Sequence, residues 1–304
     1  QGESVAVVAV RYPMETTRGA KPMTAPLDRL YRPEWAGGWT LARWLFLFAC
    51  AHAHLPRVMG IPDAYGASDM VFNNSISSLN DYLFVTPELA FGFWGVGVAG
   101  LVMMALGGRM YRTGVLLWIV GAWLLLLSEG LNVKAYDRLG LFMAVAFLVS
   151  PLSEHRLTQK YRSPIGRYFM LLIFCVIYFE TGLMKLMYES SWIGSGEVLA
   201  YHLVHPFHGN TALGAWLSGQ PLLMAPMAWF TIGFELGFPL LVLSKKTNGW
   251  VILAGALFHF VLLLLMDVGS FGYVSLAAYP VLLHPEIARS LWERVRPFIP
   301  SRAA

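Results

Sequence analysis

The chain has 304 residues, of which 57% are hydrophobic and only 13% are charged, with a mean hydropathy of +0.55. Soluble domains carry about 25% charged residues, so this composition excludes an ordinary soluble domain and indicates an integral membrane protein. The formal net charge is +4, but the basic residues lie in short clusters between apolar segments. We therefore expect contacts with the lipid bilayer and no nucleic-acid partner.

The first part of the chain, residues 1–37, has little apolar periodicity and is expected to form an N-terminal extension. Its stretch SVAVVAV is apolar enough to pair as a strand with a partner, so this extension is the expected contact with other membrane-protein subunits. The alternative is a partly ordered tail, as is common at chain ends.

The next part, residues 38–284, is expected to form an all-α bundle of about eight transmembrane helices, because it contains eight apolar segments near the length that a bilayer requires. The segments cover residues 39–55, 86–107, 113–129, 138–152, 165–187, 223–243, 249–266 and 268–284. Residues 285–304 are then expected to form a cytoplasmic C-terminal tail. In the second segment, Gly92, Gly95, Gly97 and Gly100 predict close approach of another helix.

The basic residues predict the orientation of these segments. The two termini and the loops at 108–112, 153–167 and 244–248 hold 17 of the 22 lysines and arginines. The opposite loops hold only Arg57, Lys134 and Arg138. By the positive-inside rule both termini are cytoplasmic, and the protein is expected to be a multi-pass protein of the cell (inner, cytoplasmic) membrane.

Ionisable residues within the apolar segments are the candidates for a functional site, since a charge at the centre of a membrane helix costs about 2.5–3.5 kcal/mol on insertion scales. They are Glu180, Lys185, Glu235, His259 and Asp267. Alone, Lys185 fits a lysine that reaches toward the headgroups, and His259 fits a neutral core histidine. Together the five residues favour a polar cavity within the bundle, with Glu235 paired or facing that cavity.

The stretch YFETGLMKLM, residues 178–187, carries two of these groups. Tyr178, Thr181 and Lys185 share one helical face, because they follow one another at spacings of three and four. Glu180 is about 140° away from Lys185 around the helix, too far for a good intrahelical pair. Glu180 is therefore expected to find its partner on another helix, with Arg43 or His259 as the candidates.

The sequence predicts no metal site. Cys50 and Cys175 both lie in apolar segments, as buried free thiols do. His202, His205 and His208 follow one another at spacings of three around a proline, which does not place three imidazoles on one helical face.

Three ordered motifs resemble the HTTM domain, the transmembrane module shared with vitamin K-dependent γ-glutamyl carboxylases. The first is YFETGLMKL with the downstream Trp192, Gly196 and YHL, and the second is FELGFPLLVL, which contains Glu235. The third is His259 followed by Gly269, Phe271 and AAYP. The resemblance extends from Arg43 to about Pro285.

The resemblance implies a chemical role for this region. In the carboxylases, the lysine at the position of Lys185 deprotonates reduced vitamin K, and the quinol anion then reacts with oxygen to give a strong base that enables carboxylation of glutamate. By this resemblance Lys185 is the candidate base, with Glu180 and His259 as further catalytic candidates. Tyr178, Thr181, Trp192 and Glu235 are then expected to line a site for a quinone or quinol.

The chain also departs from the carboxylase pattern. Leu262 and Leu263 stand where the carboxylases have Asn-Ser after the histidine, and the region around Asn132 and Lys134 replaces their Asn-Asn-His-Ser run. The chain ends 20 residues after the last expected span, without the luminal region that binds the carboxylase substrate. Two hypotheses result: a non-catalytic membrane subunit or scaffold that binds a lipid or quinone within a larger complex, and a quinol-dependent carboxylase- or oxygenase-like enzyme that uses Lys185 as base.

Overall fold

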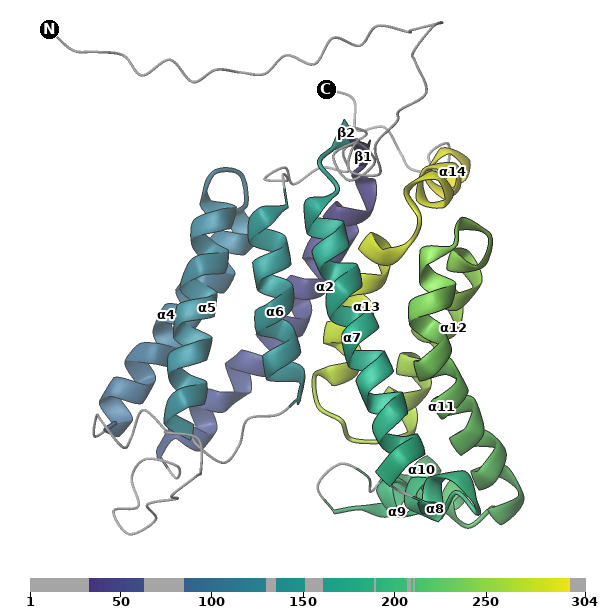
Figure 1. Cartoon of the computed structure of the whole chain (residues 1–304). Helices are drawn as coiled ribbons and strands as arrows, with labels where there is room; N and C mark the ends of the chain where they lie inside the picture. Colours follow the sequence, from purple (N-terminus) through teal and green to yellow (C-terminus); the bar gives the residue numbers. More distant parts are fainter. Residues whose placement is uncertain are drawn as a thin grey trace, which may run out of the picture.

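The protein is a bundle of long helices closed by short elements at both ends, as the computed structural model in Figure 1 shows. The structure describes residues 33–62, 85–129, 135–150, 161–188, 190–206, 209 and 211–295. The long helices, in chain order, are α2 (Gly37–His54), α4 (Pro87–Leu106), α5 (Met110–Glu129), α6 (Ala135–Val149), α7 (Ile165–Tyr188), α11 (Pro221–Leu243), α12 (Lys245–Leu265) and α13 (Phe271–Leu282).

The shorter elements lie at the two ends of this bundle. One end carries a two-residue antiparallel pair, β1 (Glu34–Trp35) with β2 (Tyr161–Arg162), and helix α14 (Pro285–Val295). The other end carries α8 (Ser190–Ile193), α9 (Glu197–Val204) and α10 (Ala212–Ser218), which lie across the long helices (Figure 1). The 3-10 helix η1 (Leu55–Gly60) continues directly from α2.

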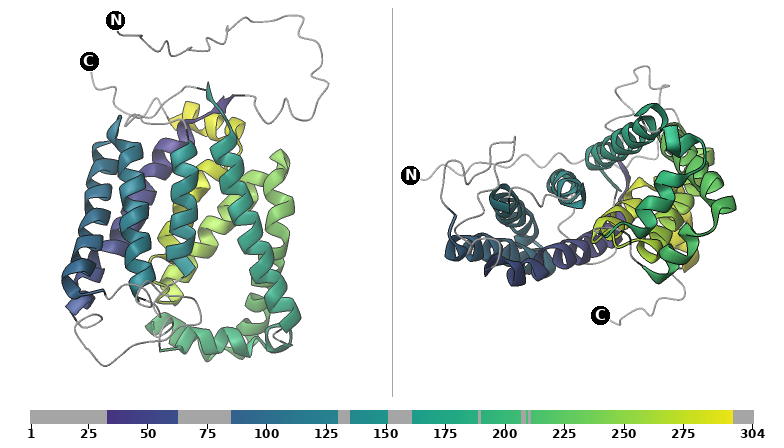
Figure 2. Two further views of the ribbon diagram at one scale, coloured as in Figure 1. Left: turned by 60° about the vertical axis from the view of Figure 1, so that its left-hand side comes forward. Right: turned by 90° about the horizontal axis from the view of Figure 1, so that it is seen from below.

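Each of the eight apolar segments coincides with one of the long helices. Four of them, α4, α7, α11 and α12, are long and apolar enough to cross a membrane, while the apolar parts of α5 and α13 are shorter. Figure 2 shows α4 and α5 on one side of the molecule and α11 and α12 on the other, with α2 and α13 between them. The expected C-terminal tail contains α14, and α2 begins at Gly37, the last residue of the expected extension. The stretch SVAVVAV lies outside the described residues.

The helices pack through an apolar core and expose a second apolar surface. The main core joins α2, α5, α6, α7 and α13, with contributions from α11 and α12, and includes Phe46, Phe147 and Phe238. Many large apolar side chains point outward instead: Leu240 is 77% exposed and Trp250 is 75% exposed. An outward apolar surface of this extent is what a lipid bilayer covers, so the fold is that of an all-helical membrane protein.

Glycines of α4 allow this helix to lie very close to α5 and to the His54 side chain of α2. A Cβ atom at Gly100 would lie 2.4 Å from the backbone nitrogen of Trp118, and one at Gly97 would lie 2.2 Å from Nε2 of His54. A Cβ atom at Gly92 or Gly95 would meet nothing within 4 Å. The close approach predicted from four glycines therefore depends on Gly97 and Gly100 only.

Candidate functional site

The polar face of α7 packs against α11, and Gly182 allows this contact. A Cβ atom at Gly182 would lie 2.9 Å from Cβ of Glu235 and 3.0 Å from Cγ of Leu236, so a side chain at 182 would push the two helices apart. Tyr178, Thr181 and Lys185 lie on the same side of α7, as their spacing predicts. The site is therefore built where two helices approach backbone to backbone.

Lys185 and Glu235 form an ion pair across this contact. Nζ of Lys185 donates to both carboxylate oxygens of Glu235 at 2.8 Å, and the two side chains are 20% and 8% exposed. The ammonium also lies 5.4 Å from the ring centroid of Trp192, within the range of a cation–π contact. The hydroxyl of Thr181 contacts the same carboxylate and donates to the backbone carbonyls of α7. Glu235 was expected to be paired or to face a cavity, and the structure shows it paired with Lys185.

A second polar cluster lies deeper along the same face of α7. The hydroxyl oxygen of Tyr178 is 2.6 Å from Nε2 of His259 on α12 and 2.6 Å from the hydroxyl oxygen of Tyr279 on α13. A phenol has one proton, so Tyr178 donates to one of these groups and accepts from the other. Nδ1 of His259 is buried and has no hydrogen-bond partner among the described residues. Phe234 and Phe238 of α11 enclose the Tyr178 ring.

The structure brings together six of the seven residues expected at the site. One group surrounds the ion pair and consists of Lys185, Glu235, Thr181 and Trp192. The second group is Tyr178, on the same face of α7, with its hydrogen-bond partner His259. Glu180 is different: it is exposed on α7 and has no hydrogen-bond or ion-pair partner among the described residues.

The partners expected for Glu180 make other contacts. The guanidinium of Arg43 lies 5.1 Å from the ring centroid of Tyr111, and His259 bonds to Tyr178. The expectation that Glu180 pairs with Arg43 or His259 is therefore wrong. Glu180 is two positions from Tyr178, which turns it to another side of the helix, and there it faces outward.

Sequence reasoning missed two polar features. Tyr279 was part of the AAYP motif, but nothing in the motif indicated that its hydroxyl meets Tyr178. Arg57 and Asp137 form a largely buried ion pair with 2.7 Å between Nη2 and Oδ2, although 80 positions separate them. The pair lines a pocket with His54, whose Nε2 donates to the Trp94 carbonyl at 3.0 Å. No local spacing connects groups so far apart in the chain.

His202, in α9, and His205, directly after it, are not placed with other described residues to hold a metal ion. His202 and His205 both pack their rings against Tyr201, and His208 lies outside the described residues. Within the described ranges, no group of three or more His, Cys, Asp or Glu side chains is placed to hold a metal ion.

The apolar helices, the lipid-type surface and a buried ion pair between two of the helices define a multi-helix integral membrane protein with a polar interior. Comparison with protein families gives the narrower assignment. The model of the HTTM domain matches residues 76–286, and the chain belongs to this family. The match begins later than Arg43, where the resemblance by motif started. Searches of curated proteins and of solved structures found no match.

Proposed function

We propose that this HTTM-family protein is a non-catalytic subunit of a larger complex in the cytoplasmic membrane, in which the helix bundle is a scaffold that holds a lipid or quinone. In this proposal residues 1–37 contact the other subunits. The bundle would cross the membrane eight times with both termini on the cytoplasmic side.

The observation that supports the scaffold most directly is the pairing of Lys185. Both carboxylate oxygens of Glu235 lie 2.8 Å from its Nζ. Together with the contact between Nζ and the Trp192 ring, these two bonds engage the Lys185 head group and join α7 to α11. This arrangement supports a role for Lys185 in holding the two helices together.

The test is gentle extraction from native membranes followed by native mass measurement. The scaffold proposal expects the protein to emerge in a complex of fixed stoichiometry with at least one other subunit. A variant that lacks residues 1–32 should lose this partner while its helix bundle remains monodisperse. Recovery of the full chain as a partner-free monomer would contradict the proposal.

The alternative function is a quinol-dependent carboxylase- or oxygenase-like enzyme that uses Lys185 as base. The hydrogen-bonded series Tyr279, Tyr178 and His259 favours it, because this series lies on the face of α7 that carries Lys185 and offers groups that exchange protons. Purified protein should then oxidise a reduced quinone in the presence of oxygen. This turnover should disappear in Lys185→Ala and persist in Lys246→Ala, which removes an exposed charge. Turnover that is equal in both variants would exclude Lys185 as the base.

A further inference from the structure

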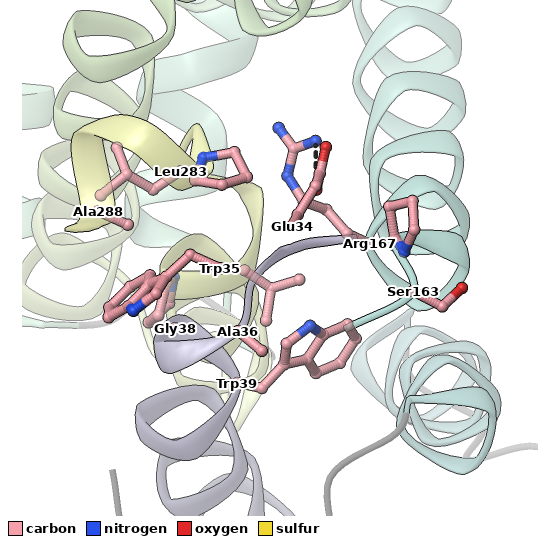
Figure 3. A pocket seen from close by; sticks show the side chains of 13 residues that line it. Glu34, Trp35, Ala36, Gly38, Trp39, Ser163, Arg167, Leu283 and Ala288 are labelled. Atoms are coloured by element: carbon pink, nitrogen blue, oxygen red, sulfur yellow. Dashed lines mark hydrogen bonds and ion pairs between the residues drawn. The ribbon is translucent and has the colours of Figure 1, made fainter. Parts of the chain in front are cut away.

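A pocket lies at the end of the bundle that carries β1, β2 and α14. Its cavity is small, about 20 Å³, so a group larger than a water molecule fits only if the Glu34 side chain moves aside. Its walls come from β1, from the first turns of α2, α7 and α14 and from the last turn of α13 (Figure 3). The pocket is far from the Lys185 pair: 18 residues of α7 separate Arg167 from Lys185, a distance of about 27 Å along a helix.

Three helices begin at this pocket and direct positive partial charge toward it. Gly38 belongs to the first turn of α2, Arg167 to that of α7 and Ala288 to that of α14, and all three line the pocket. The first backbone N–H groups of a helix have no partner within the helix, and its dipole favours an anion there. In α2 no side chain caps these groups, whereas the N–H of Ile165 in α7 donates to Oγ of Ser163 and the N–H of Glu286 in α14 donates to Nδ1 of His284. Convergence of three such ends makes the pocket attractive to an anion.

Arg167 supplies a formal positive charge in the same place. The residue is 9% exposed, and its Nε is buried without a hydrogen-bond partner. Figure 3 shows its guanidinium within the pocket beside Glu34, and the two form the ion pair of the site with 3.4 Å between Nη1 and Oε2. Charge-assisted bonds of this type are usually about 2.7–2.9 Å long, so this contact is loose. A buried arginine thus retains an unused donor and a weak partner.

The Glu34 carboxylate is only weakly held beside Arg167. Burial raises the pKa of its carboxyl group, while the charge of Arg167 and the hydrogen bond from Tyr168 lower it less. Its second oxygen accepts from the Tyr168 hydroxyl only at 3.5 Å. A stronger oxyanion in place of this carboxylate would meet the guanidinium of Arg167 and the uncapped N–H groups at the start of α2.

We propose that this pocket binds a phosphate group, with Arg167 as its main ligand and Glu34 as the carboxylate that the phosphate displaces. Arginine presents a planar set of donors that matches phosphate oxygens. Two sources have this chemistry: the headgroup of an anionic phospholipid and a soluble phosphate.

The surroundings of the pocket favour the lipid source. Trp35 and Trp39 line it, as tryptophans do at the level of headgroups. The neighbouring helix α14 exposes Leu291 and Val295 beside charged residues, which is typical of a helix lying in the membrane interface. The site lies at the other end of α7 from the Lys185 pair. The proposed phosphate binding therefore does not depend on whether the bundle is a scaffold or an enzyme.

The test compares four versions of the full chain in neutral detergent: the wild type, Arg167→Gln, Glu34→Gln and Lys246→Gln. Lys246 is exposed at the same end of the bundle, outside the pocket, so its variant controls for the loss of one positive charge. Native mass spectrometry measures binding of phosphatidylglycerol, phosphatidylcholine and inorganic phosphate. Arg167→Gln should weaken phosphatidylglycerol binding about tenfold or more. Glu34→Gln should strengthen it severalfold, and Lys246→Gln should leave it unchanged.

The probes distinguish the two sources. Preference for phosphatidylglycerol that inorganic phosphate does not displace supports the lipid, and saturable binding of inorganic phosphate that depends on Arg167 supports the soluble anion. Equal binding by the wild type and Arg167→Gln overturns the proposal. If Arg167→Gln does not fold, Glu34→Gln decides, because unchanged or weaker binding in that variant also overturns it.

Discussion

The ion pair between Lys185 and Glu235 is the contact that supports the proposed scaffold role most directly. Burying two charges usually costs about as much free energy as their attraction returns, so such a pair is weak evidence for added stability. The pair instead sets the position of the two helices, because both carboxylate oxygens of Glu235 on α11 bond to Nζ of Lys185 on α7. Removing one partner leaves the other charge buried alone, which is far more costly than removing both.

Single and double substitutions test this role. Lys185→Met and Glu235→Leu should each lower the free energy of unfolding by about 3–5 kcal/mol, since each leaves an unpaired buried charge. The double variant should recover most of the loss. The measurement is thermal unfolding in detergent, followed by size-exclusion chromatography. Glu180→Gln is the matched control on α7 and should be nearly neutral, because Glu180 is exposed. Additive losses in the double variant would show that the two charges do not stabilise each other.

The hydroxyl of Tyr178 gives a second prediction at this scale. Tyr178→Phe leaves the ring among Phe234 and Phe238 but removes the hydroxyl, which among the described residues is the only hydrogen-bond partner of His259 Nε2 and of the Tyr279 hydroxyl. Leaving buried polar groups unsatisfied costs about 1–3 kcal/mol, so the variant should unfold at a lower temperature than the wild type. Tyr273→Phe is the control, since its ring is half-buried and its hydroxyl makes no hydrogen bond among the described residues. Equal unfolding temperatures for the two variants would contradict the importance of the network.

At the scale of elements, the contact between α4 and α5 depends on particular glycines. Gly100→Ala places a Cβ atom 2.4 Å from the Trp118 backbone, and the helices must separate to admit it. Overpacking of this kind costs about 1–3 kcal/mol. Gly95→Ala on the same helix meets nothing within 4 Å and should be neutral or slightly stabilising, because alanine favours helix. Thermal unfolding of the two variants checks this difference, and a larger loss in Gly95→Ala would refute the packing.

The elements themselves were predictable from the sequence because apolar runs of membrane length have one common solution, a helix whose backbone groups bond internally. The pairing between Glu235 and some partner was predictable for the same reason, since an unpaired charge in that position is too costly. The identity of partners was not predictable. Tyr178 meets Tyr279 across 101 positions, and Arg57 meets Asp137 across 80. Such contacts depend on how helices are arranged around one another, which helical spacing alone does not determine.

The sequence also did not predict how each helix is rotated about its own axis. The four glycines of α4 looked equivalent, but only the side that faces α5 and His54 requires small residues. Glu180 and Lys185 looked equally buried in an apolar segment, yet the rotation of α7 turns one outward and the other toward α11. Periodicity predicts which residues share a face of a helix, and tertiary packing decides which of the faces is internal.

At the scale of the whole molecule, the two ends of the bundle differ in character. One end carries β1, β2 and α14, together with described basic residues such as Arg109, Arg167 and Lys246, and the other carries α8, α9 and α10 (Figure 1). Elements from the beginning and the end of the described chain thus lie at the same end. A chain that crosses the membrane an even number of times has its first and last elements on the same side. By the positive-inside rule, the end of the bundle that carries the basic residues should face the cytoplasm.

Cysteine labelling tests this orientation directly. In a background of Cys50→Ala and Cys175→Ala, we compare Lys246→Cys, in the first turn of α12, with Ser218→Cys, at the end of α10. The cells are first stripped of any wall or outer membrane, with the cytoplasmic membrane left intact. A membrane-impermeant maleimide added to them should label position 218 and leave position 246 unlabelled. Position 246 should become reactive only after the membrane is permeabilised, because its end of the bundle carries the basic loops. Labelling of 246 alone would show the opposite orientation, and equal labelling of both positions would show that the two ends of the bundle do not lie on opposite sides of the membrane.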